Sequence, residues 1–135
     1  MSKTILITGG AGFIGTHLTR LATTAGHSVR LLDNLSPQIH GENPAFSPPP
    51  GVEFVRGDVT VREDMEAALR GADTVVHLAA ETGTGQSMYE IDRYYRVNVQ
   101  GTATLLDVLA NAQTDVRNIV LASSRSVYGE GAYLC

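Results

Sequence analysis

The chain of 135 residues has one cysteine, one lysine and no tryptophan. Its single cysteine, Cys135, excludes a disulfide within the chain and favours a reducing compartment such as the cytoplasm. Ten basic residues against 14 acidic ones give a net charge of −4, so the composition provides no basic surface for nucleic acid. No apolar run approaches the length of about 20 residues that a membrane-spanning helix needs, and no signal peptide is recognisable. We therefore expect a cytoplasmic protein that binds neither membranes nor nucleic acid.

A glycine-rich segment, Thr8-Gly9-Gly10-Ala11-Gly12-Phe13-Ile14-Gly15, directly follows the apolar run at residues 5–7. A short buried strand that enters such a turn and leads into a helix is typical of a site for a dinucleotide pyrophosphate. We expect Gly9 to permit the tight turn, Gly12 to let the backbone approach the phosphates, and Gly15 to let the helix pack close to the sheet. Free N–H groups at the helix N-terminus then favour the anion.

Strands and helices alternate along the rest of the chain. Apolar runs between turn residues predict strands at residues 4–8, 28–33, 52–56, 73–78 and 116–122. Helical spacing predicts helices at 12–25, 60–70 and 87–112, and the loop at 34–51 holds all five prolines. This alternation predicts an α/β fold of the Rossmann-like, doubly wound type, with a parallel sheet of about five strands in the order 3-2-1-4-5 and helices on both faces. We expect one dinucleotide-binding domain over residues 1–135, with a ligand crevice at the carboxyl ends of strands one and four.

The helical spacing also predicts which faces are buried. The face of the first helix that we expect to be buried consists of Ile14, Leu18, Leu21 and Ala25. The long helix presents one continuous stripe, formed by Ile91, Tyr95, Asn98, Thr102, Leu105, Leu109 and Ala112. The middle helix has the residues of a capping box, because Thr60 precedes Glu63 by three positions.

Two aspartates end strands beside the expected crevice. Asp33 lies 18 residues after Gly15, where a carboxylate can accept hydrogen bonds from the ribose hydroxyls of adenosine. It would repel a 2′-phosphate and so favours NAD over NADP; the alternative is an aspartate that caps its own turn. Asp58 ends the third strand. It either binds the adenine amino group or caps a turn or a helix, and the local sequence supports these two interpretations almost equally.

Further candidates follow strands four and five or lie on the long helix. His77 is better explained as a satisfied structural histidine than as a base, whereas the small Ala79 and Ala80 let the backbone approach a cofactor. Asn98 lies on the apolar stripe, so its amide must find buried partners. It could bridge strands four and five, order a water near the site, or only tie the helix to the sheet. Ser124 could donate its hydroxyl to a substrate or simply terminate the strand. No metal site is predicted.

Six ordered segments resemble the extended short-chain dehydrogenase/reductase family, in particular its nucleotide-sugar 4-epimerases and 4,6-dehydratases. The matching segments extend from residue 4 to residue 130 and include TGGAGFIG at 8–15, DNL at 33–35, GDV at 57–59, HLAA at 77–80, VNVQGT at 97–102 and SSRSVYGE at 123–130. The segment ETGTGQSMY at 81–89 is similar to epimerases that act on deoxythymidine-diphosphate sugars.

The resemblance implies an NAD-dependent enzyme that acts on a nucleotide-sugar. In that family a tyrosine removes a proton from a sugar hydroxyl, a serine or threonine positions the hydroxyl, and a lysine lowers the pKa of the tyrosine. Ser124 matches the family serine. The matched motifs also place these residues at the cofactor, together with the three glycines: Phe13, Ile14, Asp33, Asn34, Asp58, Val59, Leu78, Ala79, Ala80 and Asn98.

The catalytic Tyr-x-x-x-Lys of the family has no counterpart in this sequence. Tyr128 belongs to the Val-Tyr-Gly turn and has Ala132 four residues later, and Lys3 is the only lysine. We therefore expect the cofactor-binding half of such an enzyme, without the C-terminal substrate domain and without turnover on its own. The alternative is a free-standing, non-redox NAD-binding module that acts as a regulator, partner subunit or scaffold. Strand 116–122 would form an apolar sheet edge, which favours a homo-oligomer.

Overall fold

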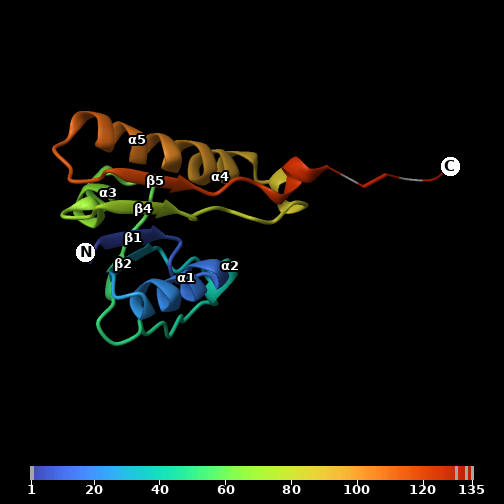
Figure 1. Ribbon diagram of the computed structural model, residues 1–135. Helices are drawn as coiled ribbons and strands as arrows, with labels where there is room; N and C mark the ends of the chain where they lie inside the picture. The colour runs from blue at the N-terminus through green and yellow to red at the C-terminus, as the bar shows by residue number, and fades with distance from the viewer. Residues whose placement is uncertain (1, 130, 133, 135) are drawn as a thin grey trace.

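The computed structural model describes residues 2–129, 131, 132 and 134. Five parallel strands form one sheet in the order β3-β2-β1-β4-β5, which confirms the predicted Rossmann-like topology (Figure 1). The strands are β1 (Thr4–Thr8), β2 (Ser28–Asp33), β3 (Glu53–Arg56), β4 (Thr74–His77) and β5 (Asn118–Leu121). Because β1 lies between β2 and β4, the direction of the chain across the sheet reverses there, and the carboxyl ends of these strands flank a crevice.

The helices are arranged on both faces of the sheet. They are α1 (Phe13–Thr24), α2 (Pro37–His40), α3 (Arg62–Leu69), α4 (Ile91–Tyr94) and α5 (Gly101–Asn111), with 3-10 turns η1 (Gln86–Met88) and η3 (Arg125–Tyr128) and a π-helical segment η2 (Tyr95–Gln100). In Figure 1, α1 and α5 lie on opposite sides of the strands that they flank. Among the described residues, no helix has the length and apolar character needed to cross a membrane.

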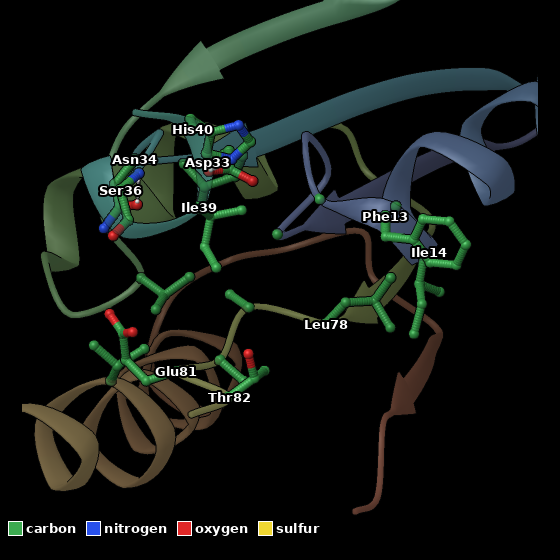
Figure 2. Close-up of a pocket in the computed structure, with 18 of the residues that line it drawn as sticks. Phe13, Ile14, Asp33, Asn34, Ser36, Ile39, His40, Leu78, Glu81 and Thr82 are labelled. Atoms are coloured by element: carbon green, nitrogen blue, oxygen red, sulfur yellow. Dashed lines mark hydrogen bonds and ion pairs between the residues drawn. The ribbon is translucent and has the colours of Figure 1, made fainter. Parts of the chain in front are cut away.

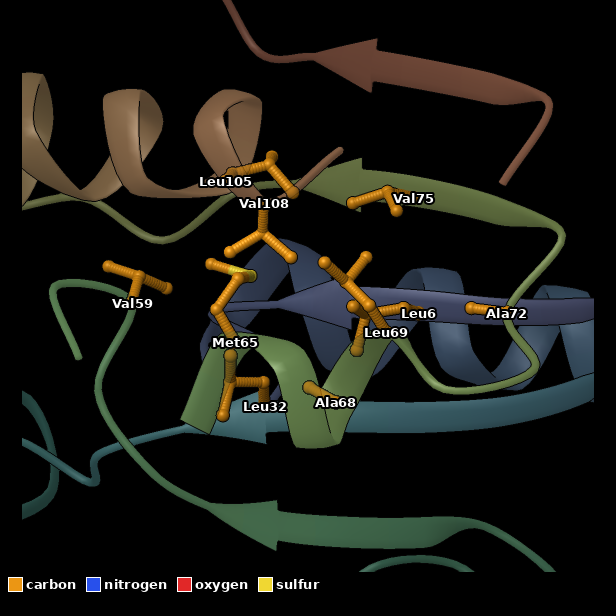
Figure 3. Close-up of a cluster of buried hydrophobic side chains, with 10 residues drawn as sticks. All are labelled: Leu6, Leu32, Val59, Met65, Ala68, Leu69, Ala72, Val75, Leu105 and Val108. Atoms are coloured by element: carbon orange, nitrogen blue, oxygen red, sulfur yellow. The ribbon is translucent and has the colours of Figure 1, made fainter. Parts of the chain in front are cut away.

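Two apolar clusters hold the layers together. On one face, α3 and α5 bury Met65, Leu69, Leu105 and Val108 against side chains of β1, β2 and β4 (Figure 3). On the other face, the smaller α1 cluster contains Ile7, Val29, Leu31 and Ala22. The sheet is therefore buried on both sides around β1 and β2, where the crevice opens.

The predicted buried face of α1 is wrong for three of its four residues, since only Leu18 packs against the core. Ile14 and Leu21 are 64% and 68% exposed, whereas Gly15, Thr19 and Ala22 are buried. A Cβ atom on Gly15 would lie 2.5 Å from the carbonyl oxygen of Gly9, so the helix approaches the loop too closely for a large side chain. This close approach selects small residues for the buried face and leaves Ile14 and Leu21 outside.

The predicted long helix is interrupted by the π-helical segment η2. Leu105 is buried as expected, but Ile91, Tyr95 and Asn98 are exposed. A π turn contains more residues than an α turn, so it rotates the preceding residues about the helix axis. As a result, the side that faces the sheet before Leu105 contains Gly101 and Val97 instead of the predicted stripe.

Two smaller expectations also need correction. The proline-rich segment 34–51 is not entirely a loop, because Pro37 begins the short helix α2 after Ser36. The predicted capping box of α3 is absent: Val61 precedes the helix, and the Thr60 hydroxyl donates to Asp58 Oδ1 at 2.7 Å. The Thr60 hydroxyl thus stabilises the turn that ends β3.

Candidate cofactor-binding site

A cavity of about 300 Å³ opens at the carboxyl ends of β1, β2 and β4. Figure 2 shows Phe13 and Ile14 at the start of α1, Asp33, Asn34, Ser36 and His40 on the side of β2 and α2, and Leu78, Glu81 and Thr82 after β4. The predicted cofactor residues that line the cavity are Gly9, Gly12, Phe13, Ile14, Gly15, Asp33, Asn34, Asp58, Val59, Leu78, Ala79 and Ala80.

The glycine loop forms the base of the cavity. Gly9 has φ +66°, in the left-handed region, and a Cβ atom there would lie 2.8 Å from the backbone nitrogen of Ala79. Gly12 precedes α1, which has no side-chain cap and no acidic residue in its first turn. The N–H groups at this helix end are therefore left for an external anion, to which the helix dipole adds a partial positive charge.

Asp33 is buried at the carboxyl end of β2 and is held by two backbone groups. Its Oδ2 accepts from the N–H of Ala11 at 3.0 Å, and its Oδ1 accepts from the N–H of Leu35 at 2.9 Å. The Leu35 contact is a turn capped by its own aspartate, and the Ala11 contact fixes the glycine loop. Each carboxylate oxygen can still accept a further hydrogen bond. His40 Nε2 lies 3.8 Å from Oδ1.

Asp58 caps the turn after β3 and also lines the cavity. Its Oδ1 accepts from the N–H and the hydroxyl of Thr60, and its Oδ2 accepts from the Asn34 amide at 3.0 Å. Burial by itself raises the pKa of Asp58, but the hydrogen bonds from Thr60 and Asn34 and the charge of Arg96 outweigh it, so the pKa lies below its usual value. Asp58 therefore presents a carboxylate, an acceptor for an amino group.

Comparison with known proteins places the chain in one family. Residues 5–134 match the NAD dependent epimerase/dehydratase family. The chain belongs to this family. It is 47% identical to the dTDP-L-rhamnose 4-epimerase of Burkholderia thailandensis over 97% of this chain and 37% of that protein. It is 36% identical to the UDP-glucose 4-epimerase of Streptomyces lividans over 96% of this chain and 38% of that protein. The chain thus spans less than two-fifths of the length of these curated relatives.

Two solved structures share the fold. Epimerase Mth375 of Methanothermobacter thermautotrophicus superposes with a TM-score of 0.79 at 31% identity, over 92% of this chain and 36% of that one. MoeE5, solved in complex with UDP-glucose and NAD, superposes with a TM-score of 0.76 at 33% identity, over 95% of this chain and 38% of that one.

NAD is the cofactor of the epimerase/dehydratase family, and the cavity fits it. Side chains at Gly9 and Gly15 would collide with backbone atoms, so these two glycines keep the loop tight beneath the open N-terminus of α1. That combination suits a pyrophosphate, and the buried carboxylate of Asp33 at the end of β2 suits a ribose diol.

Two residues that the family resemblance assigns are not among those that line the cavity. Asn98 is exposed, contrary to the expectation that it faces the sheet, because the π segment turns it outward. Its amide nevertheless binds the backbone of Glu81, with Oδ1 accepting from the N–H at 2.8 Å and Nδ2 donating to the carbonyl at 3.0 Å. Asn98 therefore ties the helix to the segment after β4.

Ser124 lies after β5 and is exposed. Its Oγ accepts from the N–H of Ser126 at 3.1 Å and caps η3, whereas β5 already ends at Leu121. The hydroxyl hydrogen is not used in that contact and can be donated elsewhere.

Several residues of the cavity were not predicted from the sequence, among them Ser36, Ile39, His40, Glu81, Thr82 and Val97. Ser36 followed by Pro37 is a helix-start signal within the expected loop, and it could have indicated α2. The position of Val97 depends on the π segment, for which the sequence has no comparable signal.

Proposed function

We propose that this chain is the cofactor-binding part of an NAD-dependent nucleotide-sugar 4-epimerase that acts on a deoxythymidine-diphosphate sugar. The cradle formed by Gly9, Gly12 and Gly15 with the carboxylate of Asp33 is the observation that carries the proposal. The sugar class is supported by 47% identity to a dTDP-L-rhamnose 4-epimerase and by the segment at 81–89.

Each part of the cavity has a distinct task in this proposal. The N–H groups at the start of α1 bind the pyrophosphate, and Asp33 binds the ribose diol. Asp58 accepts from the adenine amino group, and the small Ala79 and Ala80 leave room for the nicotinamide half beside the backbone. When bound, NAD supplies reversible hydride transfer. The apolar side chains of Leu78 and Ile14 shield that half of the cavity from water.

The chain on its own is expected to bind NAD without turning a substrate over. Ser124 would hold the sugar hydroxyl, but the sequence contains no Tyr-x-x-x-Lys, so it lacks the residues that would move the proton. The tyrosine, the lysine and the substrate-binding surface would come from residues outside this sequence. A cytoplasmic location and self-association remain part of the same proposal.

Titration with NADH, followed by nicotinamide fluorescence, tests cofactor binding directly because the chain has no tryptophan. We expect saturable binding that weakens about 10- to 100-fold in Asp33→Ala, since charged hydrogen bonds are lost. Asp115→Ala, at an exposed aspartate after α5, is the matched control and should bind like the wild type. Absence of binding by the folded wild-type chain would contradict the proposal.

Activity assays separate the epimerase from the non-redox module. The complete reading frame that encodes these residues should interconvert a dTDP-sugar and its 4-epimer, with a slower or absent reaction for the corresponding UDP-sugar. If the reading frame stops after Cys135, or if its product binds NADH and converts no nucleotide-sugar, the module becomes the better proposal.

A further inference from the structure

His77 is a buried imidazole that the proposed reaction does not use. It ends β4 directly opposite Thr8, which ends β1, and both are almost fully buried. The two atoms His77 Nδ1 and Thr8 Oγ1 are 2.7 Å apart. On the other side of the ring, His77 Nε2 lies 3.2 Å from Thr102 Oγ1 at the start of α5. One imidazole therefore connects two strands and a helix.

Counting hydrogens fixes the direction of these contacts. Thr102 Oγ1 donates its single hydrogen to the backbone carbonyl of Asn98 at 3.1 Å, because a carbonyl oxygen can only accept. His77 Nε2 is therefore the donor in its contact with Thr102, and in the neutral ring the unprotonated Nδ1 accepts from the Thr8 hydroxyl. The oxygen of that hydroxyl accepts from the N–H of Ala79 at 3.2 Å and shares the N–H of Leu78 with the backbone carbonyl of Thr8.

The same count continues into the helix. His77 Nε2–H donates to Thr102 Oγ1, whose own hydrogen is donated to the backbone carbonyl of Asn98 at 3.1 Å. Asn98 lies in η2, and its side chain binds both backbone groups of Glu81. The hydroxyl and ring hydrogens from Thr8 to Thr102 are each used once, and the Leu78 N–H is shared between the two oxygen atoms of Thr8.

The two ends of this hydrogen-bond chain hold one wall of the cofactor cavity, the segment at residues 78–81. Leu78, Ala79, Ala80 and Glu81 all line the cavity, and Figure 2 shows Leu78 and Glu81 across from Asp33 and His40. Gly9 packs so closely on Ala79 that the wall also sets the position of the glycine loop. A shift of the wall would therefore reach the pyrophosphate site.

We propose that Thr8, His77 and Thr102 form a directional hydrogen-bond chain that positions the cavity wall at residues 78–81, with His77 neutral and protonated on Nε2. His77 is thus a positioning residue for the cofactor and takes no part in proton transfer to substrate. The inference deepens the proposed function and rests on it for the identity of the ligand. The hydrogen-bond chain itself is testable without any ligand. A cationic ring would point a third donor at Thr8 and break the chain.

Nitrogen-15 NMR of the histidine ring tests the direction of the chain without cofactor. At neutral pH we expect His77 to show a protonated Nε2 and an unprotonated Nδ1, and the neutral form to persist below the pH at which an exposed histidine titrates. Burial lowers the pKa of His77, in agreement with a neutral ring. A ring protonated on Nδ1, or an imidazolium at neutral pH, would overturn the proposal.

Two substitutions of Thr102 test whether the chain sets the wall. Thr102→Val removes the hydroxyl and should raise hydrogen exchange at the Ala79 and Glu81 amides and weaken NADH binding, each by roughly 5- to 10-fold. Thr102→Ser restores the hydroxyl and should return both values to within about twofold of the wild type. Thr24→Val is the matched control, because the Thr24 hydroxyl makes the same bond to a carbonyl one turn earlier but lies at an exposed position of α1, away from the cavity wall.

The outcomes distinguish this inference from the proposed function. A folded Thr102→Val variant with wild-type exchange at the wall overturns the inference, whatever its affinity for NADH. If the wild-type protein shows the expected tautomer of the His77 ring and the expected amide hydrogen exchange but binds no NADH, the hydrogen-bond chain is supported and the proposed function is overturned. If Thr102→Val does not fold, the ring tautomer of the wild type and the behaviour of Thr102→Ser decide.

Discussion

Asp33 shows what spacing along the sequence can and cannot predict. Its distance from Gly15 and its place at the end of a strand predicted a carboxylate at the crevice, and the structure places it there. The alternative taken from the sequence, an aspartate that caps its own turn, is present as well, because the carboxylate accepts from the N–H of Leu35. The sequence did not reveal that the same carboxylate accepts from the N–H of Ala11. That contact joins segments that only the folded chain brings together, so Asp33 shapes the loop as well as lining the cavity.

Asp33 also provides a prediction on cofactor choice. Its negative charge should disfavour a 2′-phosphate, so the protein should bind NADH more tightly than NADPH. In Asp33→Asn the affinity for NADH should fall about 10-fold, while the ratio of NADH to NADPH affinity should move towards one, because the repulsion is removed. Fluorescence titrations with both nucleotides measure the ratio, with Asp115→Asn as the control. An unchanged ratio would argue against Asp33 as the discriminating group.

His77 predicts a dependence of stability on pH. Burial holds its pKa below the usual value of 6.5, so below about pH 6.5 the unfolded chain binds a proton that the folded chain does not. Stability should therefore be full above pH 6.5 and fall as the pH drops, until the folded-state pKa is reached. The contribution of this one group is at most about 1.4 kcal/mol per pH unit. Urea unfolding between pH 7.5 and 5.5 should show a shallower decline for His77→Gln than for the wild type, and equal declines would exclude His77 as the cause.

Among the strands and helices, the sequence predicted the elements correctly where the apolar pattern alone determines the packing. It failed where a close backbone contact or a change of helix type determines it. The strands were predicted to within two residues at each end, because each is a short apolar run between turn residues. The faces of α1 and of the helix that includes η2 were not, because they depend on the approach of Gly15 to Gly9 and on an extra residue in a π turn. Neither feature is encoded in the spacing of apolar side chains.

The close packing of α1 can be tested with two glycine substitutions. Alanine normally favours a helix over glycine by about 1 kcal/mol, yet Gly15→Ala should destabilise the protein, because the new Cβ would lie 2.5 Å from a backbone carbonyl. We expect a net loss of roughly 1–3 kcal/mol in urea unfolding, together with weaker NADH binding as the loop shifts. Gly85→Ala is the control, since no atom lies within 4 Å of a Cβ there and its backbone is helical. A stable Gly15→Ala variant would show that the loop can yield.

Over the whole sheet, the two edges differ in character. Within the described residues β5 pairs only with β4, and its Ile119, Val120 and Leu121 are all exposed. The other edge strand, β3, begins with the charged Glu53 and ends with the charged Arg56. The predicted strand order 3-2-1-4-5 placed the apolar strand 116–122 at this edge. An apolar edge without a neighbour favours pairing with another chain, whereas charged residues discourage it.

This asymmetry predicts self-association through β5. Light scattering should show the 135-residue chain as a dimer or larger assembly at high concentration, and Val120→Lys should shift the equilibrium towards monomer by about tenfold or more, because a charge on the edge opposes pairing. Leu21→Lys is the matched control: Leu21 is similarly exposed but lies on α1, away from β5. A wild-type chain that stays monomeric at high concentration contradicts the prediction, and equal effects of the two lysines would mean that association is not specific to the β5 edge.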